Sequence, residues 1–211
     1  AFNTKIQMRV FTWKGDRDTL MSPLDSIKHY KKFLQCGFMS MDAQTGFIKA
    51  WVGGNDYRYF KYDHVKDGKR QVGSTFKPFM ALAGLELGKR TPSYAIRDQG
   101  FFNLPGSSHR FRDWKPGGHG YVDLHKSLVV SCDTYYYMLA NDLGITTIHE
   151  FVKQFGFGQL TGIDIPGELG GLLPSIEWKR RRFNQSWFPG DTISVGIGQG
   201  FNLGTPLQLT F

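Results

Sequence analysis

The heptapeptide "GSTFKPF", residues 73–79, opens an apolar stretch and places a serine three residues before a lysine. Apolar side chains continue beyond it, and their spacing predicts a core helix over 75–87. If Ser74 caps this helix, Lys77 lies one turn further along the same face. A hydroxyl beside an amine at a helix start is the arrangement of an activated nucleophile. The alternative is an ordinary helix cap followed by a solvated lysine.

A second serine lies at a junction between two predicted helices, in the triplet Ser131-Cys132-Asp133. A serine hydroxyl is a poor nucleophile until a nearby base takes its proton, and an unprotonated lysine can act as that base. A second serine can then relay the proton to a leaving amine. S-x-x-K with S-x-[ND] and K-T-G is typical of β-lactamases and penicillin-binding proteins.

The composition describes a globular chain with an excess of positive charge. With 211 residues, of which 40% are hydrophobic and 21% charged, the chain can bury one sizeable core. The net charge of +8 favours an anionic partner, either a membrane surface or an acidic polymer. The basic run Lys179–Arg182 is more typical of a solvated helix face. No segment approaches the ~20 apolar residues of a membrane span.

Local patterns predict several further elements. In chain order these are a short helix begun by Ser22 and Pro23, a β-hairpin over 38–52, a long Gly/Pro-rich loop over 92–121, a short helix near 123–130, a helix that ends at Gly144, a helix over 147–155 with Thr147 and Glu150 in a capping box, and a final helix capped by Thr205. A loop as long as 92–121 in a compact domain is usually functional or disordered.

The segment "RQVGSTFKPF" resembles the active-serine segment of the penicillin-binding protein transpeptidases. Residues 92–211, with "LPGSSHRFRDWKPGGHGYVDLHKSLVVSCDTYYYMLANDLGI", "QFGFGQLTGIDIPGE" and "PGDTISVGIGQGFNLGTPLQ", resemble the elongation-type class B group, penicillin-binding protein 2. Residues 1–80 look closer to bifunctional class A enzymes. The resemblance implies an α+β transpeptidase fold of the penicillin-binding-protein and serine β-lactamase type, with helices against an antiparallel sheet. It also implies a linker and helical segment over 1–35 and a partial transpeptidase domain over 36–211, incomplete at its C-terminus.

The resemblance also assigns roles to the residues of the two motifs. It makes Ser74 the acylated nucleophile and Lys77 its general base. It makes Ser131 the proton relay and Asp133 the polar third member of the second motif. Neither K-T-G nor K-S-G occurs in the chain; in the family that motif lies on a sheet-edge strand and helps to form the oxyanion hole. We therefore expect this chain to acylate slowly without it.

Four potential metal ligands are spread over the long loop and the second motif. They are Asp98, Asp113, His119 and Cys132. Carboxylate, imidazole and thiolate donors suit tetrahedral zinc. Some elongation-type members carry zinc on an Asp, Asp, His, Cys set in this order, so the resemblance implies a structural zinc that pins the loop to the residue beside Ser131. The alternative is a small buried cysteine and a surface histidine.

The function that the resemblance implies is bacterial peptidoglycan D,D-transpeptidation. The acylated serine would react with the D-Ala-D-Ala end of a stem peptide, and β-lactams would acylate the same hydroxyl. Implied partners are stem peptides and elongation-machinery membrane proteins, with no nucleic acid. The implied location is the cell envelope, on the extracytoplasmic face of the membrane, with the anchor outside this chain. Two alternatives stay open: a serine β-lactamase, for which no E-x-x-L-N element is apparent, and a non-catalytic β-lactam-binding or sensor module, which the absence of K-T-G leaves open.

Overall fold

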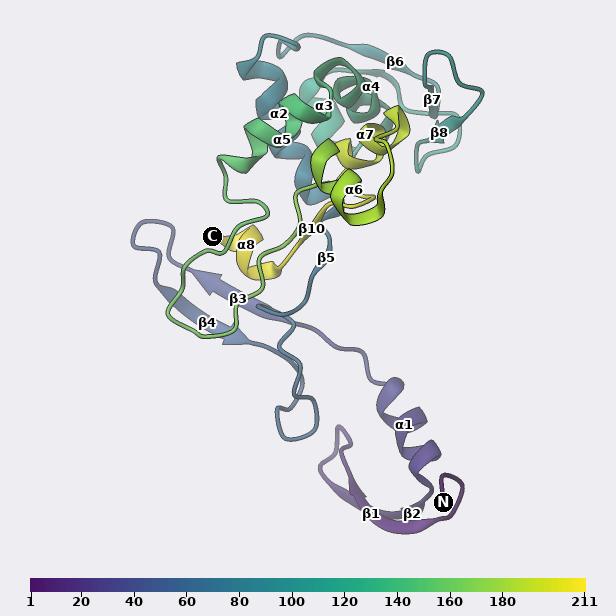
Figure 1. Cartoon of the computed structure of the whole chain (residues 1–211), viewed down its shortest axis with the longest axis vertical. Coiled ribbons are helices and arrows are strands. Elements are labelled where there is room, and N and C mark those ends of the chain that lie inside the picture. The colour runs from purple at the N-terminus through teal and green to yellow at the C-terminus, as the bar shows by residue number, and fades with distance from the viewer. The chain divides into compact units, whose positions relative to one another are not determined.

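The computed structural model describes residues 1–211 and contains two compact units, 1–65 and 66–211 (Figure 1). Both units combine helices with antiparallel strands, so the α+β class expected from the sequence is confirmed. The strands form five separate two-stranded pairs. No helix is both long and apolar enough to cross a lipid bilayer.

The first unit contains two β-hairpins with a helix between them. Its elements are β1 (Ile6–Val10), β2 (Arg17–Met21), α1 (Pro23–Lys31), β3 (Phe38–Met41) and β4 (Ile48–Val52). The Ser22 hydroxyl accepts a hydrogen bond from the Asp25 amide, and the Asp25 carboxylate accepts one in return from the Ser22 amide. This capping box fixes the start of α1, where the sequence predicts it. The predicted hairpin over 38–52 is also confirmed.

The hairpin β1–β2 is a structural element that the sequence reading did not include. Its five pairs run from Ile6 opposite Met21 to Val10 opposite Arg17. Beside it lies a cluster of aromatic rings in mutual edge, tilted or stacked contact: Phe11, Trp13, Tyr30, Phe33, Tyr59 and Phe60. Rings separated widely in the sequence meet here, so the periodicity of any one segment gives no sign of the cluster.

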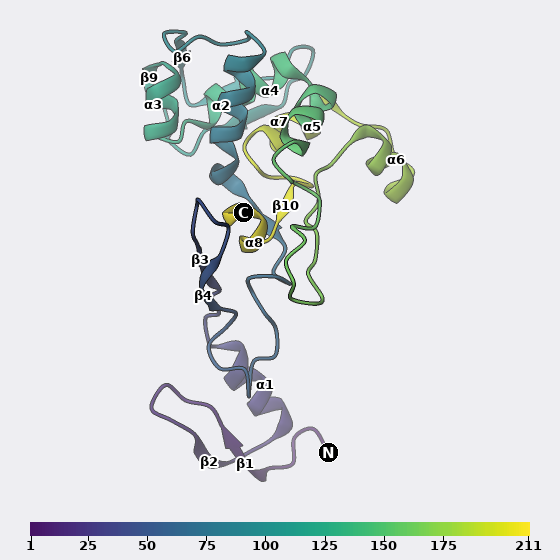
Figure 2. The same ribbon diagram turned by 90° about the vertical axis from the view of Figure 1, so that its left-hand side faces the viewer.

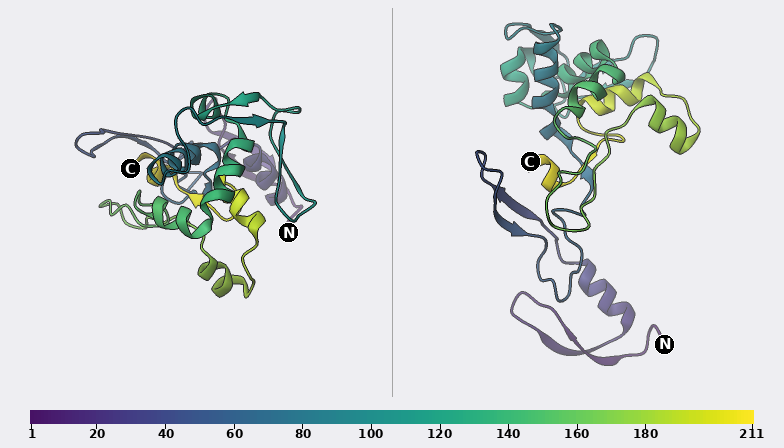
Figure 3. Two further views of the ribbon diagram at one scale, coloured as in Figure 1. Left: turned by 90° about the horizontal axis from the view of Figure 1, so that it is seen from above. Right: turned by 60° about the vertical axis from the view of Figure 1, so that its left-hand side comes forward.

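The second unit contains most of the helices. Its elements are β5 (Arg70–Gln71), a 3₁₀ turn (Gly73–Phe76), α2 (Lys77–Glu86), β6 (Ile96–Asp98), β7 (Phe101–Asn103), β8 (Arg110–Arg112), β9 (Gly120–Val122), α3 (Leu124–Val129), α4 (Asp133–Leu143), α5 (Ile145–Lys153), α6 (Ile176–Phe183), α7 (Pro189–Gly196), β10 (Leu203–Gly204) and α8 (Pro206–Thr210). Strands β5 and β10 pair, as do β6 with β9 and β7 with β8. Figure 2 shows α2, α3 and α4 side by side, and in Figures 2 and 3 α6 stands at the rim of this group.

Helix α4 forms the centre of the second unit because it is apolar on most of its surface. Its buried side chains are Thr134, Tyr135, Tyr136, Tyr137, Leu139, Ala140 and Leu143. Helix α7 approaches closely: a side chain added at Gly196 would come within 2.4 Å of the Ala140 Cβ. Glycine at position 196 therefore permits the contact between α7 and α4. Helix α4 ends at Gly144, as predicted.

The predicted loop over 92–121 is wrong, because it contains four strands. Strands β6 to β9 have three residues each; Gly100, with positive φ, lies between β6 and β7, and Gly120, also with positive φ, begins β9. Strands this short are below the usual length of about five residues, and the glycine and proline residues between them give the segment the composition of a loop. Of the two strand pairs, β9 contacts α3, and β6, β7 and β8 contact α4.

Two smaller expectations also need correction. Helix α5 begins at Ile145 directly after Gly144, so Thr147 and Glu150 form no capping box. Within the basic run, Lys179 is only 3% exposed and its ammonium lies 2.5 Å from the Asp191 carboxylate. The other three residues of the run, Arg180, Arg181 and Arg182, are exposed as predicted. An ion-pair partner twelve residues away cannot be read from a run of like charges.

Candidate active site

The segment before α2 is held by a glycine-rich turn near the end of the chain. Gly73 has φ +56° and its amide donates to the Gly198 carbonyl at 2.8 Å. A Cβ on Gly198 would lie 2.1 Å from the Gly73 carbonyl oxygen, so only glycine permits this approach. Ser74 follows in the 3₁₀ turn and is exposed. Its side chain does not cap α2, which begins at Lys77 with no side-chain cap; the cap considered from the sequence is wrong.

Ser131 lies at the junction of α3 and α4 in an unusual backbone conformation. Its φ is +53°, in the left-handed region that non-glycine residues seldom occupy. Strained residues of this kind persist where the surrounding structure fixes them, and they cluster at active sites. The Ser131 hydroxyl donates to Ser74 Oγ at 2.9 Å. The sharp turn therefore aims the second serine at the first.

Lys77 is buried under the same junction, with 1% of its surface exposed. Its Nζ donates to the Ser131 carbonyl at 2.8 Å, to Ser131 Oγ at 3.0 Å and to Asp133 Oδ1 at 2.5 Å. These three acceptors match the three N–H donors of an ammonium group. The Tyr136 ring lies 5.5 Å from the nitrogen and covers it.

Asp133 is the counter-charge of Lys77. Burial raises the pKa of its carboxyl group above the usual range, and the hydrogen bond from Lys77 opposes that shift. The two groups form a charge-balanced pair below the two serines. The hydrogen bonds run from Lys77 to Ser131 and on to Ser74, so a reversal of their direction carries a proton from Ser74 to the lysine. All four motif residues predicted from the sequence thus meet in one site.

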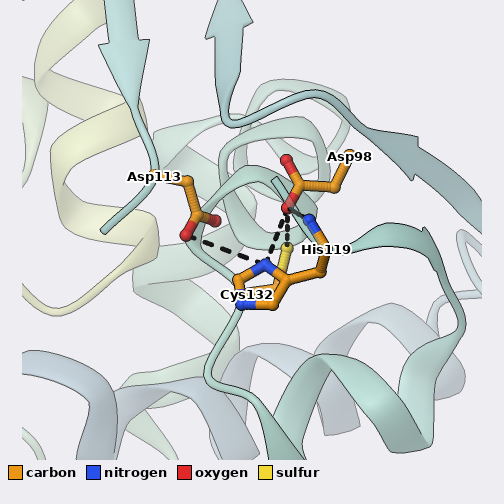
Figure 4. Close-up of side chains that lie close together, drawn as sticks. All are labelled: Asp98, Asp113, His119 and Cys132. Atoms are coloured by element: carbon orange, nitrogen blue, oxygen red, sulfur yellow. Dashed lines mark hydrogen bonds and ion pairs between the residues drawn. The ribbon is translucent and has the colours of Figure 1, made fainter. Parts of the chain in front are cut away.

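The four predicted metal ligands also meet. One ligand atom each from Asp98, Asp113, His119 and Cys132 lies within 4.8 Å of the others. Figure 4 shows the four side chains pointing toward one another. Donors around tetrahedral zinc are about 3.3–3.8 Å apart, given metal–ligand bonds of about 2.0–2.3 Å. Small side-chain shifts would bring these atoms to that spacing.

The electrostatics of this cluster are those of a site for a cation. The side chains of Asp98 and Asp113 are fully buried, and His119 is the one basic side chain within 4 Å of either carboxylate. His119 Nδ1 lies 2.8 Å from Asp98 Oδ2, while its Nε2 is buried with no hydrogen-bond partner. Burial opposes ionisation of Asp98, but hydrogen bonds from Gly100 and His119 outweigh it and lower its pKa to about 2.

Two ionised carboxylates buried this close together are costly unless a cation balances them. Burial first, and then the charges of Asp98 and Asp113, raise the pKa of the Cys132 thiol. A metal ion would reverse that effect, because a coordinated thiol is deprotonated. The donor set and the charge deficit therefore fit a divalent metal such as zinc.

The sequence reading did not identify the residues that support these sites. Thr134 donates to Asp113 Oδ2 from both its amide, at 3.0 Å, and its hydroxyl, at 3.3 Å. It thereby joins the metal-ligand cluster to the start of α4, one residue after Asp133. Gly198 is the other supporting residue, through its contact with Gly73. The segment GIGQG was visible in the sequence, but no local pattern indicates which backbone it approaches.

Comparison with known proteins identifies the family. The penicillin binding protein transpeptidase domain matches residues 36–210, and the penicillin-binding protein middle domain matches residues 1–34. The chain belongs to the penicillin-binding protein transpeptidase family. Its S-x-x-K and S-x-D motifs coincide with the hydroxyl and lysine cluster at Ser74.

Individual relatives are of the class B type. The chain is 51% identical to the peptidoglycan D,D-transpeptidase MrdA of Acinetobacter baumannii over 148 residues, which cover 70% of this chain and 22% of that protein. The crystal structure of Pseudomonas aeruginosa PBP2 in complex with WCK 5153 is 44% identical, with a TM-score of 0.69 over 74% of this chain and 35% of that one. The chain thus spans about a quarter of the length of the MrdA proteins.

Similarity to a class A type protein is present at lower identity. Penicillin-binding protein 1A of Neisseria flavescens is 34% identical over 175 residues, which cover 81% of this chain and 20% of that protein. The resemblance to penicillin-binding proteins expected from the sequence is confirmed, and the identity is higher to the MrdA proteins than to this class A type protein.

Proposed function

We propose that this chain carries out the acyl-transfer chemistry of a peptidoglycan D,D-transpeptidase. The observation that carries the proposal is the position of Ser131 Oγ, 2.9 Å from Ser74 Oγ and 3.0 Å from Lys77 Nζ. A hydroxyl between a nucleophile and an amine is placed to move a proton in either direction. Relatives named peptidoglycan D,D-transpeptidase at 44–51% identity support the same reaction.

The reaction begins with the exposed Ser74 hydroxyl. Its oxygen attacks the penultimate carbonyl carbon of a D-alanyl-D-alanine stem peptide, while its proton passes through Ser131 to unprotonated Lys77. The C–N bond then breaks, and the leaving D-alanine amine takes a proton back through Ser131. An amine of a second stem peptide attacks the resulting ester, which forms the cross-link and restores the Ser74 hydroxyl. β-Lactams acylate the same oxygen and stop at the ester.

Lys77 and Asp133 prepare these proton transfers. The lysine must lose a proton before it can accept the one from Ser74. We assign Asp133 to hold the lysine nitrogen below Ser131. The hydrogen bonds from Lys77 to Asp133 and to Ser131 Oγ keep the amine within reach of the relay hydroxyl.

Zinc is the proposed cofactor, held by Asp98, Asp113, His119 and Cys132. Its role is structural: it would neutralise two buried carboxylates and tie the β6–β9 segment to Cys132, the neighbour of both Ser131 and Asp133. No step of the acyl transfer needs it. The ligand residues act on catalysis only by fixing the turn that aims Ser131.

The proposed partners and location follow from the class B relatives. They are stem peptides as substrates, β-lactams as inhibitors, and membrane proteins of the elongation machinery as assembly partners of the whole protein. This reaction takes place in the bacterial cell envelope, at the extracytoplasmic face of the membrane.

The experiment that tests the proposed function is labelling with fluorescent penicillin. Ser74→Ala should abolish the label, because the ester cannot form without that oxygen. Ser93→Ala, at an exposed serine outside the site, is the matched control and should label like the parent protein. Labelling of Ser74→Ala at the parent level would contradict the proposal.

A further inference from the structure

In the β6–β9 segment the acidic side chains are buried and the lysine and arginine side chains are exposed. Residues 92–121 contain two acidic side chains, Asp98 and Asp113, and both lie in the buried metal-ligand cluster. The lysine and arginine side chains of the same residues are all exposed: Arg97, Arg110, Arg112 and Lys115. None of these four lies within 4.0 Å of a carboxylate, although eight ion pairs occur outside residues 92–121.

Two of the arginines share one face of the hairpin β7–β8. Arg112 pairs with Phe101 and Arg110 pairs with Asn103, so these four side chains point to the same side. The opposite side carries Phe102 and Phe111, which pack against the hydrophobic core. The arginines therefore face solvent, about 6.6 Å apart along the strand at ~3.3 Å per residue.

This face is joined by hydrogen bonds to the helix that carries Asp133. The Tyr137 hydroxyl, on α4, donates to the Arg112 carbonyl at 3.2 Å. The next residue, Asp113, accepts two hydrogen bonds from Thr134 at the start of α4. Helix α4 also carries Asp133, one of the catalytic cluster formed by Ser74, Lys77, Ser131 and Asp133. The basic face and this cluster are therefore attached to the same helix.

Helix α6 is the other basic region of the second unit, and its geometry differs. Arg180, Arg181 and Arg182 are consecutive, so successive side chains point about 100° apart around the helix. They cannot meet one extended ligand together. On a strand, residues two apart point the same way. Of these two basic regions, the β7–β8 face is the one whose arginine side chains point to the same side.

We propose that the exposed face of β7–β8 binds carboxylate groups of a peptidoglycan strand through Arg110 and Arg112. This inference rests on the proposed function. A guanidinium group matches a carboxylate with two parallel hydrogen bonds. Arg110 already lies over the Phe101 ring, at 4.7 Å, which fixes the orientation of its fork. The face would hold a strand beside the site while Ser74 reacts.

A lipid headgroup is the competing anion, and the face does not favour it. Binding at a bilayer surface combines basic side chains with exposed apolar side chains that insert between lipids. Here the one apolar side chain on the face, Phe101, is covered by Arg110. The recognition is therefore of carboxylates on a polymer, and not of a membrane.

The test is co-sedimentation of the intact protein with purified peptidoglycan sacculi at low and physiological salt. The double variant Arg110→Glu/Arg112→Glu should bind at least about tenfold more weakly, and parent binding should weaken with salt. The matched control Arg180→Glu/Arg182→Glu has the same charge change on α6 and should bind like the parent. Sacculi whose carboxylates have been converted to amides should bind neither the parent nor the control.

Three outcomes would overturn the inference. These are equal loss of binding in both double variants, undiminished binding to amidated sacculi, and binding to phosphatidylglycerol vesicles that depends on Arg110 and Arg112. Penicillin labelling of Ser74 is measured on the same samples. If the parent is labelled but its binding does not depend on the arginines, this inference fails and the proposed function stands. If neither the parent nor Ser93→Ala is labelled, the proposed function fails.

Discussion

The catalytic cluster and the metal-ligand cluster are neighbours, joined at Cys132 and Asp133, but they balance charge in different ways. In the catalytic cluster, one buried lysine faces one carboxylate and two hydroxyl groups, and every donor of the Lys77 nitrogen has an acceptor. In the metal-ligand cluster, two fully buried carboxylates face one histidine and one thiol. The first cluster is complete within the protein itself, whereas we propose that a cation completes the second. Loss of the lysine should therefore lower the acylation rate, whereas loss of the metal should lower the stability of the fold.

The largest effect is expected at Lys77. Lys77→Arg keeps the positive charge but removes a base, because arginine does not deprotonate in proteins. The second-order rate of penicillin acylation should fall by at least about 10²-fold, as is typical when a general base is lost. Lys179→Arg, at the other buried lysine paired with an aspartate, is the control and should acylate within a few-fold of the parent. Comparable rates in Lys77→Arg and the parent would exclude Lys77 as the base.

The next largest effect concerns the metal. Elemental analysis should find about one zinc per chain in the parent and in His125→Ala, an exposed histidine outside the cluster, but much less in His119→Ala. Chelation should lower the free energy of unfolding by about 3 kcal/mol, the contribution of a ligand present at roughly 100 times its Kd. A metal-free parent whose melting temperature does not respond to chelator would show that hydrogen bonds alone balance Asp98 and Asp113.

A smaller effect is expected at the remote pair Lys179–Asp191. This pair joins α6 to α7 and lies among the rings of Trp187, Phe188 and Phe201. Lys179→Met leaves a partly buried carboxylate without its cation and should lower the unfolding free energy by about 2 kcal/mol in urea titration. Acylation of the folded variant should stay near the parent rate. If acylation fell as far as in Lys77→Arg, then Lys179 would also be required for acylation, and the assignment of Lys77 alone as the base would be contradicted.

The smallest effect on stability is expected at Ser131. Ser131→Gly relieves the positive φ but adds conformational freedom to the unfolded chain, and the two changes nearly cancel, within about 1 kcal/mol. The same variant removes the hydroxyl relay, so acylation should fall while the melting temperature hardly moves. Parallel losses of both quantities would mean that Ser131 is structural.

The sequence predicted those features that depend on local patterns. The start of α1 at Ser22, the end of α4 at Gly144 and the cap of α8 at Thr205 are confirmed because capping needs only residues within one turn. The motif residues were also predictable, because the spacing of Ser74 and Lys77 is itself the signal. Their assembly with Ser131 rests on a tertiary contact that no spacing describes.

The features that escaped prediction depend on partners far away in the chain. The strands β6 to β9 are too short and too rich in neighbouring glycine to show alternation. The burial of Lys179 requires Asp191, and the close approach of Gly73 and Gly198 joins positions 125 residues apart. Burial and pairing of this kind are decided by the packing of the second unit as a whole.

The most direct test of the central claim is to locate the covalent bond. The protein is incubated with penicillin, digested, and mapped by tandem mass spectrometry. The account predicts one acyl adduct per chain, on Ser74, and its absence in Lys77→Arg at the same exposure. An adduct on any other residue, Ser131 included, would contradict the assignment of nucleophile and relay.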